Sequence, residues 1–148
     1  MFSNAAEYAI KACIWIANNA SDKHLVKAVD LAEATSMPKA FIAKILQSLS
    51  KKNIVTSVKG PNGGFYIYKN QPELISIYSI VEAVDGNSIL HSCVLGIKVC
   101  SDAKPCPAHE KYKPIRLQIA DFLLNTNLKE LAEGLKTGHA YLKKKKKI

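Results

Sequence analysis

Residues 38–68 read PKAFIAKILQSLSKKNIVTSVKGPNGGFYIY, and the fold can be inferred by working outward from them. The apolar residues of 38–51 recur at the spacing of one helix face, which predicts a helix. Two short runs rich in β-branched and aromatic residues, 54–58 and 65–68, predict strands joined by the glycine-rich turn 59–64. The apolar helix positions are Ile42, Ile45, Leu46 and Leu49.

The residues before this segment complete a DNA-binding pattern. Residues 4–18 predict a helix rich in alanine, and 26–34 predict a second, shorter helix that ends at a turn, 35–37. Pro38 then suits the start of a helix, where its missing N–H has no helical partner. Two helices around a tight turn, followed directly by a hairpin, indicate a winged helix-turn-helix head.

The residues after the hairpin predict three more helices. They cover 76–84, then about 108 or 112 to 124, and a last short helix through 135, with a long loop over 87–107. The longest of these helices carries more apolar surface than one small domain offers to cover, so we expect a second copy of the chain to cover it. The expected dimer-interface residues are Ile115, Ile119, Phe122 and Leu123.

The expected fold class is mainly α with a small β-hairpin: a winged helix-turn-helix head plus a long C-terminal dimerisation helix. The chain divides into five parts. These are a DNA-binding head (1–70), a connecting helix (71–86), a cysteine-rich cluster-binding loop (87–107), a dimerisation helix with a short terminal helix (108–138) and a lysine-rich tail (139–148).

Composition excludes several classes of protein. The 148 residues carry a net charge of +9, and no apolar run reaches the ~18 residues of a membrane span. The start of the chain lacks the pattern of a signal peptide, so we expect a cytoplasmic protein. No glycine-rich nucleotide loop follows a strand, and no nucleophile–base pair is evident, so we do not expect an enzyme.

The distribution of charge favours double-stranded DNA as the partner. Residues 1–70 hold nine Lys and four acidic residues, whereas residues 71–142 are close to neutral. Lys39 and Lys44 lie on the outer face of the predicted recognition helix, and Lys59 precedes the turn of the wing. An N-terminal half with this excess of positive charge suits the phosphate backbone.

Three cysteines and a histidine cluster in the long loop, with the spacing Cys93-x6-Cys100-x5-Cys106-x2-His109. Soft thiolates and an imidazole within so short a segment indicate a metal or cluster site. The spacing lacks the short C-x2-4-C knuckle of structural zinc sites and better suits an iron–sulfur centre. The fourth cysteine, Cys13, falls on an apolar helix face and is interpreted as a buried structural thiol.

Several of these segments together resemble the Rrf2 family of winged-helix transcription regulators, of the IscR and NsrR type. The resemblance covers about residues 2–135. It rests on SVKGPNGGF (57–65), IVEAVDG (80–86), the cysteine loop, and Glu7-Tyr8-Ala9 with Lys11.

The resemblance implies a homodimer that binds promoter DNA, with the recognition helix in the major groove and the wing in the minor groove. The implied DNA-binding residues are Lys39, Phe41, Lys44, Lys59, Pro61, Asn62 and Gly63. Lys59 stands where the family commonly has arginine, Phe41 where tyrosine is frequent, and Ala43 where IscR has an acidic residue. The operator sequence therefore cannot be copied from IscR.

The resemblance also implies a two-iron two-sulfur cluster held by Cys93, Cys100, Cys106 and His109. The first gap is one residue longer than in IscR, which leaves a different cluster type or another fourth ligand open, Glu7 or His91. Two rival hypotheses remain. One is a DNA-binding regulator whose loop cysteines form a thiol switch, and the other is a zinc-stabilised interaction module.

Overall fold

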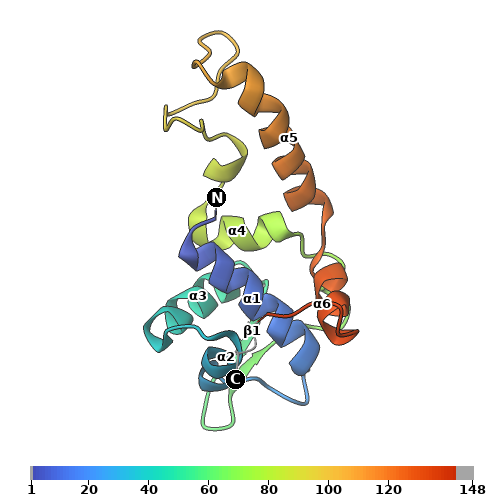
Figure 1. Ribbon diagram of the computed structural model, residues 1–148. Coiled ribbons are helices and arrows are strands. Elements are labelled where there is room, and N and C mark those ends of the chain that lie inside the picture. The colour runs from blue at the N-terminus through green and yellow to red at the C-terminus, as the bar shows by residue number, and fades with distance from the viewer. Residues whose placement is uncertain (1, 143–148) are drawn as a thin grey trace, which may run out of the picture.

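The computed structural model describes residues 2–142, which form six α-helices, one 3-10 turn and a two-stranded antiparallel hairpin. Figure 1 shows the head around α1, with α5 extending away from it and the hairpin at the opposite end. The bounds are α1 Asn4–Asn19, α2 Ala28–Thr35, α3 Lys39–Lys51, β1 Thr56–Val58, β2 Gly64–Tyr66, α4 Ile77–Asp85, η1 Ser88–Leu90, α5 His109–Asn125 and α6 Leu128–Lys136.

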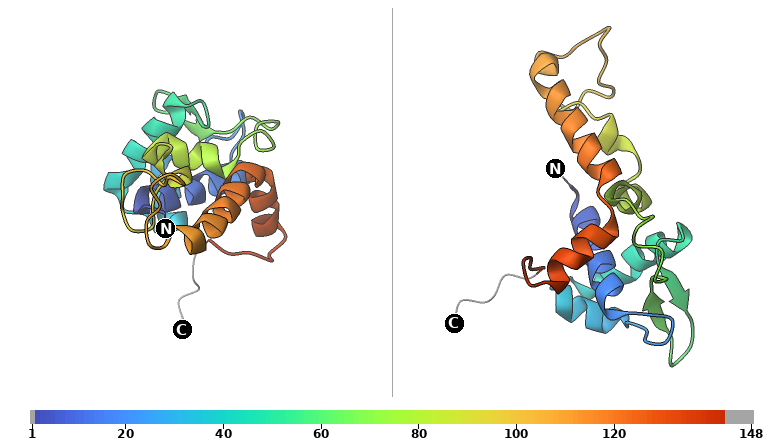
Figure 2. Two further views of the ribbon diagram at one scale, coloured as in Figure 1. Left: turned by 90° about the horizontal axis from the view of Figure 1, so that it is seen from above. Right: turned by 90° about the vertical axis from the view of Figure 1, so that its right-hand side faces the viewer.

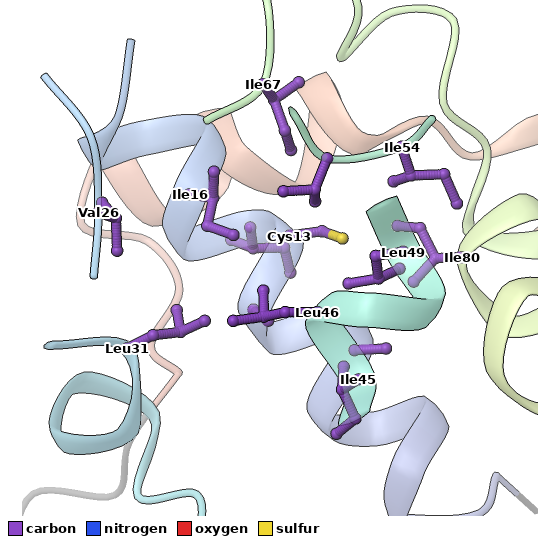
Figure 3. Packing of buried hydrophobic residues seen from close by; sticks show 14 of the residues in the cluster. Cys13, Ile16, Val26, Leu31, Ile45, Leu46, Leu49, Ile54, Ile67 and Ile80 are labelled. Carbon is purple, nitrogen blue, oxygen red and sulfur yellow. The ribbon is translucent and has the colours of Figure 1, made fainter. Parts of the chain in front are cut away.

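Helix α1 is the centre of the head, because α2, α3, α4 and α6 all pack against it. Its inner positions are mostly small, which lets the neighbouring helices approach closely. Figure 3 shows Cys13 among the aliphatic side chains of the core, and burial raises the pKa of its thiol far above the usual value. The expectation of a structural thiol is therefore confirmed. The buried residues of α1 are Ala6, Ala9, Ala12, Cys13, Ile14 and Ile16.

The helix-turn-helix is formed by α2 and α3. Helix α2 ends at Ser36, whose left-handed backbone (φ 57°) reverses the chain, and α3 begins directly after Pro38. The predicted apolar stripe is correct, since all four of its residues are buried in the core: Ile42, Ile45, Leu46 and Leu49.

The wing is shorter than the sequence predicts. Ile54 and Val55 belong to no strand, because their N–H groups donate to the carbonyl of Leu49 at the end of α3 and their side chains enter the core. Asn53, with a φ of 56°, makes this turn possible. The second strand ends at Tyr66, two residues earlier than predicted.

The sequence pattern predicts Val26 as the first residue of the second helix, but α2 begins at Ala28. Val26 lies beside the hairpin and exchanges two backbone hydrogen bonds with Phe65, of 3.0 and 2.8 Å. Gly64 permits this contact, because a Cβ there would lie 2.7 Å from the carbonyl oxygen of Val26. The wing is thereby fixed to the segment that precedes α2.

Helix α5 leaves the head from the end that joins α6. Backbone bonds from Ile77 to Thr126 and from Leu128 to Ile75 hold the α5–α6 junction against the start of α4. Asn127 caps α6 as its side chain accepts from the N–H of Glu130 at 3.0 Å. Figure 1 and the right-hand view of Figure 2 agree that the loop joining η1 to α5 lies at the far end of α5 from the wing.

These elements confirm the expected fold class, a mainly helical chain with a small hairpin. The predicted loop 87–107 does contain a short element, η1, which the sequence pattern did not reveal. Among residues 2–142 no helix is long and apolar enough to cross a membrane. The lysines of the predicted tail, Lys143 to Lys147, lie outside the described residues.

Leu123 joins α5 to the head, where it is fully buried against Ala6, Ile77 and Val81. We expect Leu123→Ala to lower the free energy of unfolding by about 2–5 kcal/mol, through lost apolar contact and the cavity left behind. Leu74→Ala is the matched control, since Leu74 is 83% exposed and should change stability by less than about 0.5 kcal/mol. Urea unfolding at one fixed protein concentration measures both, and equal losses would contradict this packing.

Candidate DNA interface and cysteine–histidine site

The outer face of α3 is polar and exposed, as the sequence predicts. Lys39 and Lys44 are exposed about one and a half turns apart, together with Gln47. No acidic residue lies in the first turn of α3, so no carboxylate of that turn offsets the partial positive charge at the start of the helix. An anionic partner such as a phosphate backbone suits this surface.

Phe41 connects α3 to α1. It is 50% exposed, and its ring lies 6.3 Å from that of Tyr8, centroid to centroid. The ammonium of Lys11 lies 5.8 Å from the same Tyr8 ring, within cation–π range. The contacts of Tyr8 with Phe41 and with Lys11 thus join α3 to α1 at the surface of the head.

The tip of the wing presents backbone and one cation. Lys59, Pro61 and Asn62 are exposed, whereas Gly63 is half-buried inside the turn. The N–H of Gly63 donates to the carbonyl of Gly60 at 2.9 Å, and a Cβ on Gly63 would lie 2.1 Å from the carbonyl oxygen of Val58. Gly63 therefore shapes the turn, and it offers little of its own surface to a partner.

The loop cysteines and the histidine come together as two pairs. The Sγ atoms of Cys93 and Cys106 lie 3.5 Å apart, and Cys100 Sγ lies 3.2 Å from Nδ1 of His109. The pairs are neighbours, because the backbone N–H of His109 donates to the carbonyl of Cys106 at 2.9 Å. In the described part of the chain, no three Cys, His, Asp or Glu side chains are arranged to hold a single metal ion.

The first pair consists of two thiols with different environments. The backbone N–H of Leu95, more than any other group, lowers the pKa of Cys93. Burial of the Cys106 sulfur raises the pKa of its thiol, and the hydrogen bond with the Cys93 side chain raises it further. Cys93 is therefore the first of the two to become a thiolate, the form that binds metals and attacks disulfides.

The second pair is oriented by residues that the sequence analysis did not identify. His109 is only 2% exposed, and its Nε2 lies 2.7 Å from Oδ1 of Asp102. The same oxygen accepts a hydrogen bond from Lys113 at 2.7 Å, and Lys113 more than His109 lowers the pKa of Asp102. The sequence gives one weak indication of this contact: Lys113 follows His109 by about one helical turn, so the two side chains share a face of the helix.

Among residues 2–142, neither of the two alternative fourth ligands makes a side-chain hydrogen bond to these pairs. His91 is exposed, and its backbone carbonyl, rather than its side chain, contacts the loop by accepting from the N–H of Cys100 at 3.4 Å. Glu7 is exposed on α1. Within one copy of the chain, Cys93, Cys100, Cys106 and His109 are the residues that come together.

Helix α5 shows apolar side chains on two sides. Ile115 (52% exposed) and Phe122 lie on one side, and Leu117 and Leu124 lie on roughly the opposite side. Ile119 is half-buried between α5 and the head, and Leu123 is fully buried there. Leu123 was therefore wrongly predicted as an interface residue, because within its own chain it has no surface left to offer.

The sequence matches a described family. Residues 2–134 match the Rrf2 family, which is described as iron-dependent transcriptional regulators. A candidate HTH-type transcriptional regulator of Aquifex aeolicus is 36% identical over 133 residues, which cover 88% of this chain and 90% of the relative. The HTH-type transcriptional regulator IscR of Pectobacterium atrosepticum is 29% identical over 132 residues, which cover 89% and 79%.

Solved structures share the fold. CymR, the global cysteine regulator of B. subtilis, matches with a TM-score of 0.72 at 20% identity, covering 90% of this chain and 96% of that one. IscR of T. potens matches with a TM-score of 0.71 at 16% identity, covering 95% and 91%.

The winged helix-turn-helix and the exposed lysines of α3 define the class, a DNA-binding transcription regulator rather than an enzyme. Within that class, the match over residues 2–134 shows that the chain belongs to the Rrf2 family.

We expect Lys59→Ala to weaken binding to all double-stranded DNA and to reduce the slope of log affinity against log salt by about one, because one phosphate contact is lost. Lys111→Ala is the control, since Lys111 is exposed on the first turn of α5 and far from the wing. Fluorescence anisotropy at several salt concentrations measures both slopes. An unchanged slope for Lys59→Ala would show that Lys59 meets no phosphate.

Proposed function

We propose that this regulator works as a homodimer whose Cys93, Cys100, Cys106 and His109 hold a two-iron two-sulfur cluster. Such a cluster supplies a redox-active and reversibly lost prosthetic group, which suits a sensor of redox state, nitric oxide or cluster supply. The observation that carries the proposal is the arrangement of these four side chains as two adjacent pairs.

The distances within each pair fit two ligands of one metal ion, and the separation of the four side chains into two pairs fits two metal ions better than one. Two ligand atoms bonded to one tetrahedral metal at about 2.0–2.3 Å lie about 3.3–3.8 Å apart. The pair distances of 3.5 and 3.2 Å are within or close to that range. Two neighbouring pairs would supply two ligands to each of two irons, whereas a single zinc ion would draw all four side chains together.

The head supports docking of α3 into the major groove and of the wing into the minor groove. Lys39, Phe41 and Lys44 would face DNA from α3, and Lys59, Pro61 and Asn62 from the wing. Gly63 contributes by shaping the turn. Since Lys59 carries a point charge without the planar fork of arginine, it suits a phosphate contact better than bidentate readout of a base.

The loop and the head are mechanically joined through α5. Arg116 donates from Nη1 to the carbonyl of Leu90 at 2.7 Å, which fixes η1, and with it the start of the loop, to α5. Leu123, two turns further along α5, is buried in the head. If the loop becomes more or less ordered, the position of α5 relative to the head should therefore change. In a dimer, α5 would set the spacing of the two DNA-binding heads.

The cluster hypothesis predicts a brown protein after purification without oxygen, with visible absorption and about two irons and two sulfides per chain. Cys100→Ala should lose most of both the iron and the absorption, because one iron loses a ligand. Cys13→Ala is the matched control and should keep them, since Cys13 is buried in the core away from the loop. Iron and sulfide analysis with absorption spectra measures this.

Colourless, iron-free protein after anaerobic reconstitution would contradict the cluster and favour the thiol switch. The 3.5 Å separation of the Cys93 and Cys106 sulfurs supports that second candidate. An added oxidant would then take two electrons from this pair, with release of two protons, and form a disulfide, which intact mass with and without alkylation detects.

The dimer hypothesis predicts that Ile115→Asp weakens self-association at least about tenfold, because it places an unpaired charge in an apolar interface. The exposed side chain of Ile115 should let each chain still fold. Leu117→Asp, at a residue 56% exposed on the other side of α5, is the matched control and should keep the dimer. Sedimentation velocity measures the dimer in both variants. Loss of the dimer only in Leu117→Asp would contradict the prediction, because the interface would then lie on the other side of α5.

A further inference from the structure

The buried imidazole of His109 has a polar partner at each ring nitrogen. Nε2 faces the carboxylate of Asp102 at 2.7 Å, and Nδ1 faces Cys100 Sγ at 3.2 Å. Rotation of the ring by half a turn would put carbon atoms in place of both nitrogens. These two partners therefore select one orientation of the ring.

The same contacts assign the proton. A carboxylate only accepts hydrogen bonds, so Nε2 carries the hydrogen and donates it to Asp102. A neutral imidazole has a single N–H, which leaves the lone pair on Nδ1, the atom beside Cys100. A metal ligand needs such a lone pair, and the structure offers it on the side where the cysteines lie.

Asp102 is itself held in place, although its side chain is 71% exposed. Lys113, one turn further along α5 than His109, donates to Oδ1 of Asp102 at 2.7 Å. The carboxylate thus spans from the loop to two successive turns of the helix. An exposed aspartate with two such contacts is fixed more firmly than a solvated loop residue.

We propose that Asp102 is a positioning residue of the metal site, which turns the His109 ring so that Nδ1 is presented to the metal and makes that nitrogen a stronger donor. This inference rests on the proposed cluster function. Carboxylate partners act in this way on histidine ligands of other metals, where their loss lowers metal affinity about 10- to 100-fold.

Titration of metal-free, reduced protein with Co²⁺ tests the inference without an iron–sulfur cluster, because the Cys100–His109 pair would supply two ligands to one Co²⁺ ion and bound Co²⁺ absorbs visibly. Asp102→Ala should weaken Co²⁺ binding about 10- to 100-fold. Asp102→Asn should restore part of the affinity, since its amide oxygen still accepts from Nε2. Lys111→Ala is the matched control: Lys111 is an exposed lysine in the first turn of α5, so its loss should leave the affinity near that of the wild type.

The reduction potential of the reconstituted cluster separates an effect through His109 from general destabilisation. Asp102→Asn should raise the potential, because the oxidised, more positive cluster loses electron donation from the ligand. In a His109→Cys background the ring is absent, so the same substitution should lose most of that shift. Circular dichroism confirms that each variant is folded.

The outcomes distinguish the two proposals. If the wild type binds neither Co²⁺ nor a cluster, both the proposed function and this inference fail. If the wild type binds and Asp102→Ala binds equally well, only the positioning role is overturned. An equal shift of potential in the His109→Cys background would also overturn it, because Asp102 would then act through its charge alone.

Discussion

The close approach of four helices to α1 is the constraint on which the rest of the structure depends. It requires small side chains at the contact, and α1 provides Ala9, Ala12 and Cys13, all essentially without exposed surface. Larger residues there would push α3 and α4 outward, and the space between packed helices cannot absorb added volume without strain. The orientation of α3 therefore follows from the inner face of α1.

Helix α5 has a different relation to the head. It is attached at one end by Leu123 and extends beyond the core, with the cysteine loop at its other end. Few contacts within the chain hold the loop, apart from the bond of Arg116 to Leu90 and the Asp102 network. A segment with so few buried contacts is where a bound group can change structure at low cost. The cysteine loop and the wing thus lie at opposite ends of the molecule (Figure 1).

Much of the fold could be predicted because its signals are local. The stripe on α3 and the glycine turn of the wing each follow from a few neighbouring residues. The errors occurred where a distant partner decided the outcome. Val26 continues the wing because Phe65 offers backbone partners, and Ile54 enters the core because Leu49 accepts its N–H. Leu123 faces its own head, since only the arrangement of α4 and α1 reveals which side of α5 is covered.

By itself, the sequence determined the class of the protein and the four residues of the candidate metal site, because helix periodicity, turn chemistry and clustered soft ligands are legible along the chain. Only the tertiary structure decided how those four residues pair. It also revealed the contacts of Asp102 with His109 and with Lys113. The physical reason is that hydrogen bonds of this kind depend on distances of about 3 Å between side chains, and a loop of irregular backbone sets these without any repeat in the sequence.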